Sequence, residues 1–182
     1  HTPWANRAEL YIGILKEATR KDLRASNAPM RLWDYAIECR ARIHNAVPRP
    51  LFQNDGLSPH YATFGEHGDI SNLCNYKWFE WVYYRNDPSF PQNKERLGRI
   101  LGPIKNEGNQ MAQAILNSNA KVVSRRSIRK LSVEEIHSES EKTKRQIFDD
   151  IIRDKLGDSV VEPSHPANIP YKDGDEPDLA SL

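Results

Sequence analysis

Apolar residues recur at helical spacing in the first quarter of the chain. Between residues 6 and 26 they step by three or four positions, at Leu10, Tyr11, Ile14, Leu15 and Ala18. This spacing predicts an amphipathic helix with one buried face. Asn6 is a suitable N-cap for that helix.

A second helix is expected over residues 29–45, with Pro29 in its first turn. Its broad apolar face consists of Leu32, Trp33, Ala36, Ile37, Ala41 and His44. Trp33 lies within that face and is therefore expected to be a core residue. Pro48 and Pro50 end the helix, and Pro59 to Phe64 can form one further turn.

The pattern then changes to short aromatic and β-branched runs, which are typical of strands. The first candidate covers residues 77–84, and its aromatic side chains favour a core role over a base-stacking role. Three more candidates cover residues 97–104, 111–117 and 121–124, the last running on toward Arg129. Short strands at this spacing predict a small antiparallel barrel.

The last quarter of the chain is strongly polar. Residues 132–156 predict a charged helix, with capping-box spacing from Ser132 to Glu135. Its thin apolar stripe consists of Ile136, Ile147, Ile151 and Phe148. Residues 157–182 combine prolines with acids, and we expect this segment to be a disordered acidic linker.

Charge is unevenly distributed, although the net charge of the 182 residues is only +1. Between Arg99 and Lys130, Glu107 is the one acid, and the basic residues are Arg99, Lys105, Lys121, Arg125, Arg126, Arg129 and Lys130. This bias favours a polyanion site on the predicted barrel. Cys39 and Cys74 match no metal-ligand spacing and are expected to be buried, reduced thiols. No apolar run approaches the ~18 residues of a membrane span.

Three blocks of the sequence together resemble the integrases of copia-type retrotransposons. The first is HTPWANRAE at residues 1–9, the second covers residues 58–73, and the third covers residues 97–126. They occur in the family's order. The resemblance implies an α+β chain from the integrase part of a Pol polyprotein.

The resemblance also implies a division into segments. Residues 1–75 would be the C-terminal helices of a ribonuclease H-like integrase core, and residues 76–131 would form a small basic SH3-like β-barrel. Residues 132–156 would be the charged helix, and residues 157–182 the disordered acidic linker.

Glu9 would be the third of three carboxylates that hold two Mg²⁺ or Mn²⁺ ions in the intact enzyme. The two Asp residues of that set would lie before residue 1, so this chain alone is expected to be inactive. A purely structural alternative makes Glu9 the capping-box partner of Asn6.

Five basic residues are candidate DNA contacts. Lys16 and Arg20 follow Glu9 along one face of the first helix, where integrases lay basic residues along the DNA end. Arg125, Arg126 and Arg129 form the densest basic cluster of the barrel. Solvated charges on a helix face and a barrel rim are the structural alternatives.

The implied function of the parent protein is DNA integration in the nucleus by metal-dependent strand transfer, with element ends and target DNA as partners. A homo-oligomer is possible in the intact enzyme. One alternative is a non-catalytic nucleic-acid-binding module, either a relic or a domesticated element. Another is a structural protein with no role on nucleic acid.

Overall fold

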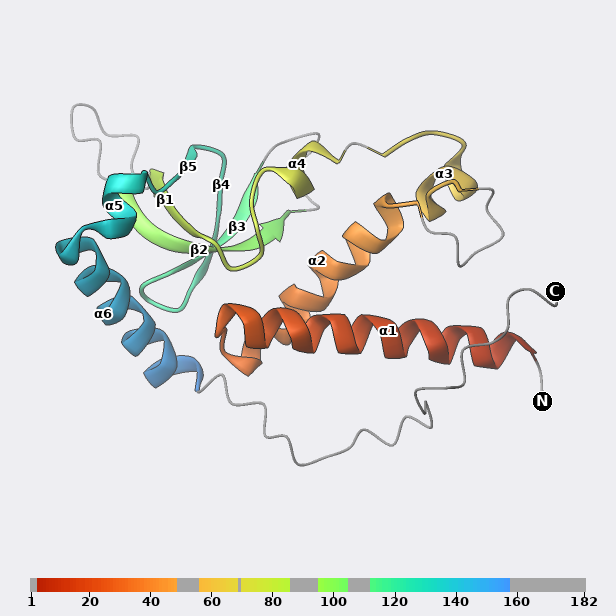
Figure 1. The fold of residues 1–182 in the computed structure, drawn as a ribbon, viewed down its shortest axis with the longest axis horizontal. Helices are drawn as coiled ribbons and strands as arrows, with labels where there is room; N and C mark the ends of the chain where they lie inside the picture. Colours follow the sequence, from red (N-terminus) through yellow and green to blue (C-terminus); the bar gives the residue numbers. More distant parts are fainter. Residues whose placement is uncertain (1–2, 49–55, 69, 86–94, 105–111, 158–182) are drawn as a thin grey trace.

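The computed structural model describes residues 3–48, 56–68, 70–85, 95–104 and 112–157, with side chains described from Ala8 onward. The chain is α+β, with two long helices, two short helices, a five-stranded antiparallel sheet and two further helices (Figure 1). The expected disorder of the acidic linker lies outside the described residues from residue 158 onward. Within them, no helix is both long and apolar enough to cross a membrane.

The two long helices form the N-terminal part of the fold. α1 spans Pro3–Ser26, and α2 spans Trp33–Ala46 after the 3-10 turn η1 at Met30–Leu32. Asp22 on α1 accepts hydrogen bonds from the guanidinium of Arg40 on α2, which ties the two helices together.

Two expectations for these helices are wrong. α1 begins at Pro3, so Asn6 lies inside the helix rather than at its N-cap, because Pro is well suited to a first helical position. Trp33 is 53% exposed, although its neighbour Leu32 is buried. The chain changes from a 3-10 turn to an α-helix at Trp33. The α-helical spacing that placed Trp33 on the buried face is therefore interrupted at this residue.

Short helices connect α2 to the sheet. α3 spans Pro59–Phe64, as expected, with its N-terminus capped by Ser58 and its C-terminus followed by left-handed Gly65. α4 spans Ser71–Cys74. The expectation of two buried thiols holds for Cys39 but is wrong for Cys74, which is exposed.

The sheet has the strand order β4-β3-β2-β1-β5, and every pair is antiparallel. The strands are β1 Trp81–Arg85, β2 Glu95–Pro103, β3 Gln113–Asn117, β4 Val122–Arg125 and β5 Ile128–Lys130. The four expected segments are therefore strands, with the last one divided in two. β1 starts later than expected, because Phe79 has a left-handed backbone with φ of 60°.

The edge strands β4 and β5 are consecutive in the sequence, and this forces the sheet to curl. Only Arg126 and Ser127 connect them. A flat sheet would hold its two outer strands about 19 Å apart, whereas the three backbone steps from Arg125 to Ile128 reach at most about 11 Å. The sheet must therefore bend strongly, and Figure 1 shows the bend in β2.

Side chains alternate between two buried faces of the curled sheet. The concave face holds the cluster of Val82, Tyr84, Ile100 and Ile115. The convex face contributes Leu101, Ala114 and Leu116 to a larger core, which also contains Leu23 of α1, Ala36 of α2 and Phe148 of α6. One core thus joins the N-terminal helices, the sheet and the last helix.

Two glycines of β2 permit this close packing. A Cβ on Gly98 would lie 2.5 Å from Ile115 and 3.1 Å from Tyr84, so a side chain there would displace the concave core. Gly102 has φ of 120° and follows an irregularity in the β2–β3 register after Ile100. This bulge bends β2 where α2 packs against it.

The charged segment after the sheet forms two helices rather than one. α5 spans Val133–His137, and α6 spans Glu139–Leu156, with extended Ser138 between them. The capping box of Ser132 and Glu135 is confirmed. The expected apolar stripe is wrong at Ile136 and Ile147, which are exposed.

Arg99 fastens α6 to the sheet. Its guanidinium donates two hydrogen bonds to the carboxylate of Asp149, at 3.0 and 2.9 Å, and one to the backbone oxygen of Phe79 at 3.0 Å. It also lies 3.4 Å from the ring centre of Trp81, which makes an edge-to-face contact with Phe148. Arg99 is therefore a structural residue, although it belongs to the basic set counted from the sequence.

We predict that Phe148→Ala will destabilise the whole chain by about 3–5 kcal/mol, because it removes a 3% exposed ring from the shared core. Ile147→Ala is the matched control, since Ile147 is adjacent on the same helix and 54% exposed. It should change the free energy of unfolding by less than about 1 kcal/mol. Denaturant unfolding followed by circular dichroism measures both, and equal losses would contradict this packing.

Candidate nucleic-acid interface

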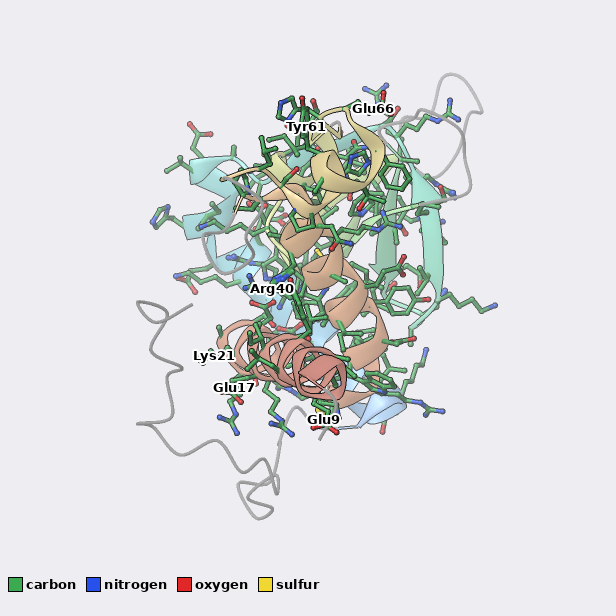
Figure 2. All side chains as sticks on the ribbon, turned by 90° about the vertical axis from the view of Figure 1, so that its right-hand side faces the viewer. Glu9, Glu17, Lys21, Arg40, Tyr61 and Glu66 are labelled. Atoms are coloured by element: carbon green, nitrogen blue, oxygen red, sulfur yellow. The ribbon has the colours of Figure 1, made fainter. Side chains whose placement is uncertain are left out.

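The candidate residues of α1 share one outward face. At ~100° per residue, Glu9, Lys16 and Arg20 fall within about 40° of one another around the helix axis. Glu9 and Lys16 are exposed, and Arg20 forms an ion pair with Glu17 at 3.5 Å. Figure 2 shows Glu9 and Glu17 projecting outward from α1. The face therefore carries both charges rather than a purely basic stripe.

The described residues do not supply a complete metal site around Glu9. They contain no group of three or more His, Cys, Asp or Glu side chains that could hold a metal ion. A site for two divalent ions needs several carboxylate oxygens. Glu9 by itself does not fit that requirement.

The three candidate arginines of the sheet have different environments. Arg125 ends β4 on the concave face, and its guanidinium carbon lies 6.0 Å from the ring centre of Tyr84. Arg126 lies in the link to β5 and is exposed. Arg129 lies on β5, where it faces the convex side and the helix α5. Arg125 therefore lies on the concave face, whereas Arg129 lies on the convex face.

Arg129 is held by two carboxylates. It pairs with Glu95 of β2 at 2.6 Å and with Glu135 of α5 at 2.8 Å, and its guanidinium carbon lies 4.6 Å from the ring centre of Tyr83. Hydrogen bonds from Arg129, and then from the backbone of Ser132, lower the pKa of Glu135 to about 2. The positive charge of Arg129 is therefore neutralised locally, which weakens its candidacy as a phosphate contact.

Paired groups also lie elsewhere on the sheet, at Tyr83 on the convex face and at Lys130, the register partner of Val82, on the concave face. Tyr83 donates a hydrogen bond to Glu141, and burial followed by this bond raises the pKa of the phenol. Lys130 lies 3.5 Å from Glu80. Three of the seven basic residues counted on the predicted barrel, Arg99, Arg129 and Lys130, are thus paired with acids.

Sequence reasoning missed Arg96. This residue is exposed on β2, and its Cα is the register partner of Tyr84 on β1. The missed signal is the two-residue strand period: Arg96, Gly98 and Ile100 alternate with Leu97 and Arg99. The two arginines of β2 therefore lie on opposite faces of the sheet.

The candidate face of α1 and the β4–β5 link lie on separate parts of the molecule (Figure 1). Two cavities, of about 330 and 300 Å³, flank Arg42 of α2. Arg42 donates hydrogen bonds to the backbone oxygen of Pro103 at 2.6 Å and to Glu38 at 2.9 Å. These volumes are at the small end of ligand pockets, and the described residues that line them include no nucleophile activated by a base.

Comparisons with known proteins give no match for this chain: no family model, no curated protein and no solved structure is similar to it at a significant level. The arguments for function therefore come from the sequence blocks and from the arrangement of charged residues on the fold.

We predict that Arg129→Gln will raise the pKa of Glu135 toward its ordinary value, because the variant removes the first cause of the depression. The depressed pKa in the folded state means that the pair stabilises α5 above about pH 4.5 and loses this contribution as pH falls toward 2. Carboxyl NMR titration measures the shift, with Lys144→Gln as the control on α6. A pKa of Glu135 that stays near 2 in Arg129→Gln would refute the pairing.

Proposed function

We propose that this chain is the C-terminal part of the integrase region of a copia-like retrotransposon Pol polyprotein, and that its role is to hold DNA. The observation that carries the proposal is the order of the three sequence blocks along the elements. Most of the first block forms the first turns of α1, the second includes α3 and most of α4, and the third runs from β2 to the link after β4.

The fold supports this proposal at two places. Helices α1 and α2 pack together ahead of the sheet, as the last helices of a ribonuclease H-like core would. The antiparallel order β4-β3-β2-β1-β5, with a two-residue link that curls the sheet, fits a small SH3-like barrel.

In the parent reaction, which takes place in the nucleus, a 3′-hydroxyl of the element's DNA end would attack the phosphorus of a target phosphodiester. A new phosphodiester would form, and the target strand would be released with a free 3′-hydroxyl. Glu9 would contribute one metal-binding carboxylate, and an upstream Asp pair would contribute the others. Within this chain, the work of the described residues would be electrostatic. Lys16 and Arg126 are exposed, and Arg20 and Arg125 are half-buried.

A non-catalytic nucleic-acid-binding module, either a relic or a domesticated element, is the second candidate. Its DNA contacts would be the same basic residues, Lys16, Arg20, Arg125 and Arg126. The two candidates share DNA binding and differ in whether the parent frame supplies the two Asp residues, which sequencing upstream of His1 would reveal.

We predict that the chain alone has no strand-transfer or end-processing activity with Mg²⁺ or Mn²⁺, because one carboxylate cannot hold two such ions. The assay incubates the chain with end-labelled duplex DNA and follows joined and shortened products. Glu9→Gln is the matched control and should behave as the unaltered chain does. Joined products that disappear in Glu9→Gln would show that the chain carries a complete catalytic set.

We predict weak binding of duplex DNA with little sequence preference. About four neutralised phosphates would make log K fall with log salt at a slope of about −3 to −4. Fluorescence anisotropy of two unrelated duplexes, measured from low to high salt, gives the slope and the preference. An affinity that does not change with salt would exclude phosphate contacts and with them the DNA-holding role.

A further inference from the structure

We propose that the phosphate-binding site of the sheet is the Tyr84 cluster, defined as Arg96 and Arg125 beside the ring of Tyr84 on the concave face. Exposed Arg126 adjoins this cluster in the link between β4 and β5. Arg129 is not part of it. The ligand is the sugar-phosphate backbone of double-stranded DNA. This choice of ligand rests on the proposed function, whereas the choice of residues rests on the geometry of the sheet.

Arg96 is placed beside Tyr84 by strand pairing. The two residues are register partners on adjacent antiparallel strands, and directly opposite side chains on one face have Cβ atoms about 4.5–5.5 Å apart. The shared face is the concave one, because a Cβ on Gly98, two residues after Arg96, would lie 3.1 Å from the Tyr84 ring. The guanidinium of Arg96 is exposed beyond this buried ring.

Arg125 reaches the same ring from the opposite edge of the sheet. It ends β4, two residues after Val123, which packs against the concave cluster. The short link curls this edge toward β1, and the guanidinium carbon of Arg125 lies 6.0 Å from the centre of the Tyr84 ring. Two arginines from strands far apart in the sequence therefore meet at one aromatic side chain.

Arg126 adjoins the cluster in the link and is exposed. It lies between Arg125 and Ile128, and Ile128 is the register partner of Tyr84 on β5. The backbone N–H of Arg85 donates to the backbone oxygen of Ser127 at 3.2 Å, which fixes the link against the end of β1. The position of Arg126 is thus set by strand pairing on both sides.

The charges of two arginines act on the phenol of Tyr84. Tyr84 is 2% exposed, and burial raises the pKa of its phenol, while the charges that oppose this shift come from Arg96 and Arg125. Among the described residues, neither Arg96 nor Arg126 forms an ion pair. Glu95, which precedes Arg96 in the sequence, faces the opposite side of the sheet and pairs with Arg129.

The fold thus separates its arginines by role. Arg99 and Arg129 face the convex side, where Asp149, Glu95 and Glu135 neutralise them. The Tyr84 cluster presents two guanidinium groups from two strands, and exposed Arg126 adjoins it. Guanidinium groups bind phosphate oxygens through paired donors, and contacts to phosphate position DNA without reading its sequence.

The test is DNA binding by the full chain, measured by fluorescence anisotropy with a duplex of about 20 base pairs. The double variant Arg96→Gln with Arg125→Gln should lower affinity at least tenfold at about 50 mM salt and reduce the salt slope by about 2, because each lost phosphate contact removes ~0.9. Lysine at both positions should restore most of the slope, since it restores the charge.

Two matched variants make the outcome specific. Arg129→Gln removes the same charge from the convex face and should change affinity less than twofold. Arg31→Gln removes an exposed charge from η1 and controls for net charge. Unfolding curves for each variant separate lost binding from lost fold. The Tyr84 cluster is not the site if the double variant binds DNA as tightly as the unaltered chain does. It is also not the site if Arg129→Gln lowers DNA affinity more than the double variant does.

The possible failures can be told apart. If the unaltered chain binds no DNA at any salt concentration, the proposed function fails, and the cluster loses its ligand. If the chain binds DNA and the loss follows Lys16→Gln with Arg20→Gln instead, the proposed function stands, and α1 rather than the Tyr84 cluster holds the phosphates.

Discussion

The half-buried contact of Arg99 with Asp149 holds the last helix against the sheet. Burial lowers the pKa of this guanidinium, and the charge and hydrogen bonds of Asp149 oppose the shift. A buried arginine without a carboxylate partner would be strongly destabilising. Because Arg99 belongs to β2 and Asp149 to α6, the sheet cannot keep its charged interior without the helix that follows it. The aromatic contact between Trp81 and Phe148 covers the same junction.

The sequence predicts the elements better than it predicts their partners. Helices and strands follow from local periodicity, so α1, α2, α3 and the strands lie close to their expected positions. Spacing alone assigns Trp33 and Ile147 to buried faces, yet both are exposed, because tertiary packing decides which side of a helix is covered. The division at Ser138 follows from an extended residue that no periodicity indicates.

The sequence also does not reveal which charged residues pair with one another in the fold. A count of basic residues between positions 99 and 130 treats all of them alike, whereas the fold buries Arg99, neutralises Arg129 and leaves Arg126 exposed. The acids responsible are Asp149, Glu95 and Glu135, which lie 6 to 50 positions from their partners. Only the sheet register and the docking of α5 and α6 bring them together, so the candidate site could be located only in part from the sequence.

Strand β2 places its two arginines on opposite faces of the sheet. Its two arginines differ by an odd number of positions, so the pleat sends Arg99 into the core and Arg96 to the opposite face. A slip of one residue in the register would exchange them and bring an unpaired charge into the interior. The bulge at Gly102 and the tight approach at Gly98 resist such a slip. The register of β2 therefore determines which of its two arginines pairs with Asp149 and which lies at the surface.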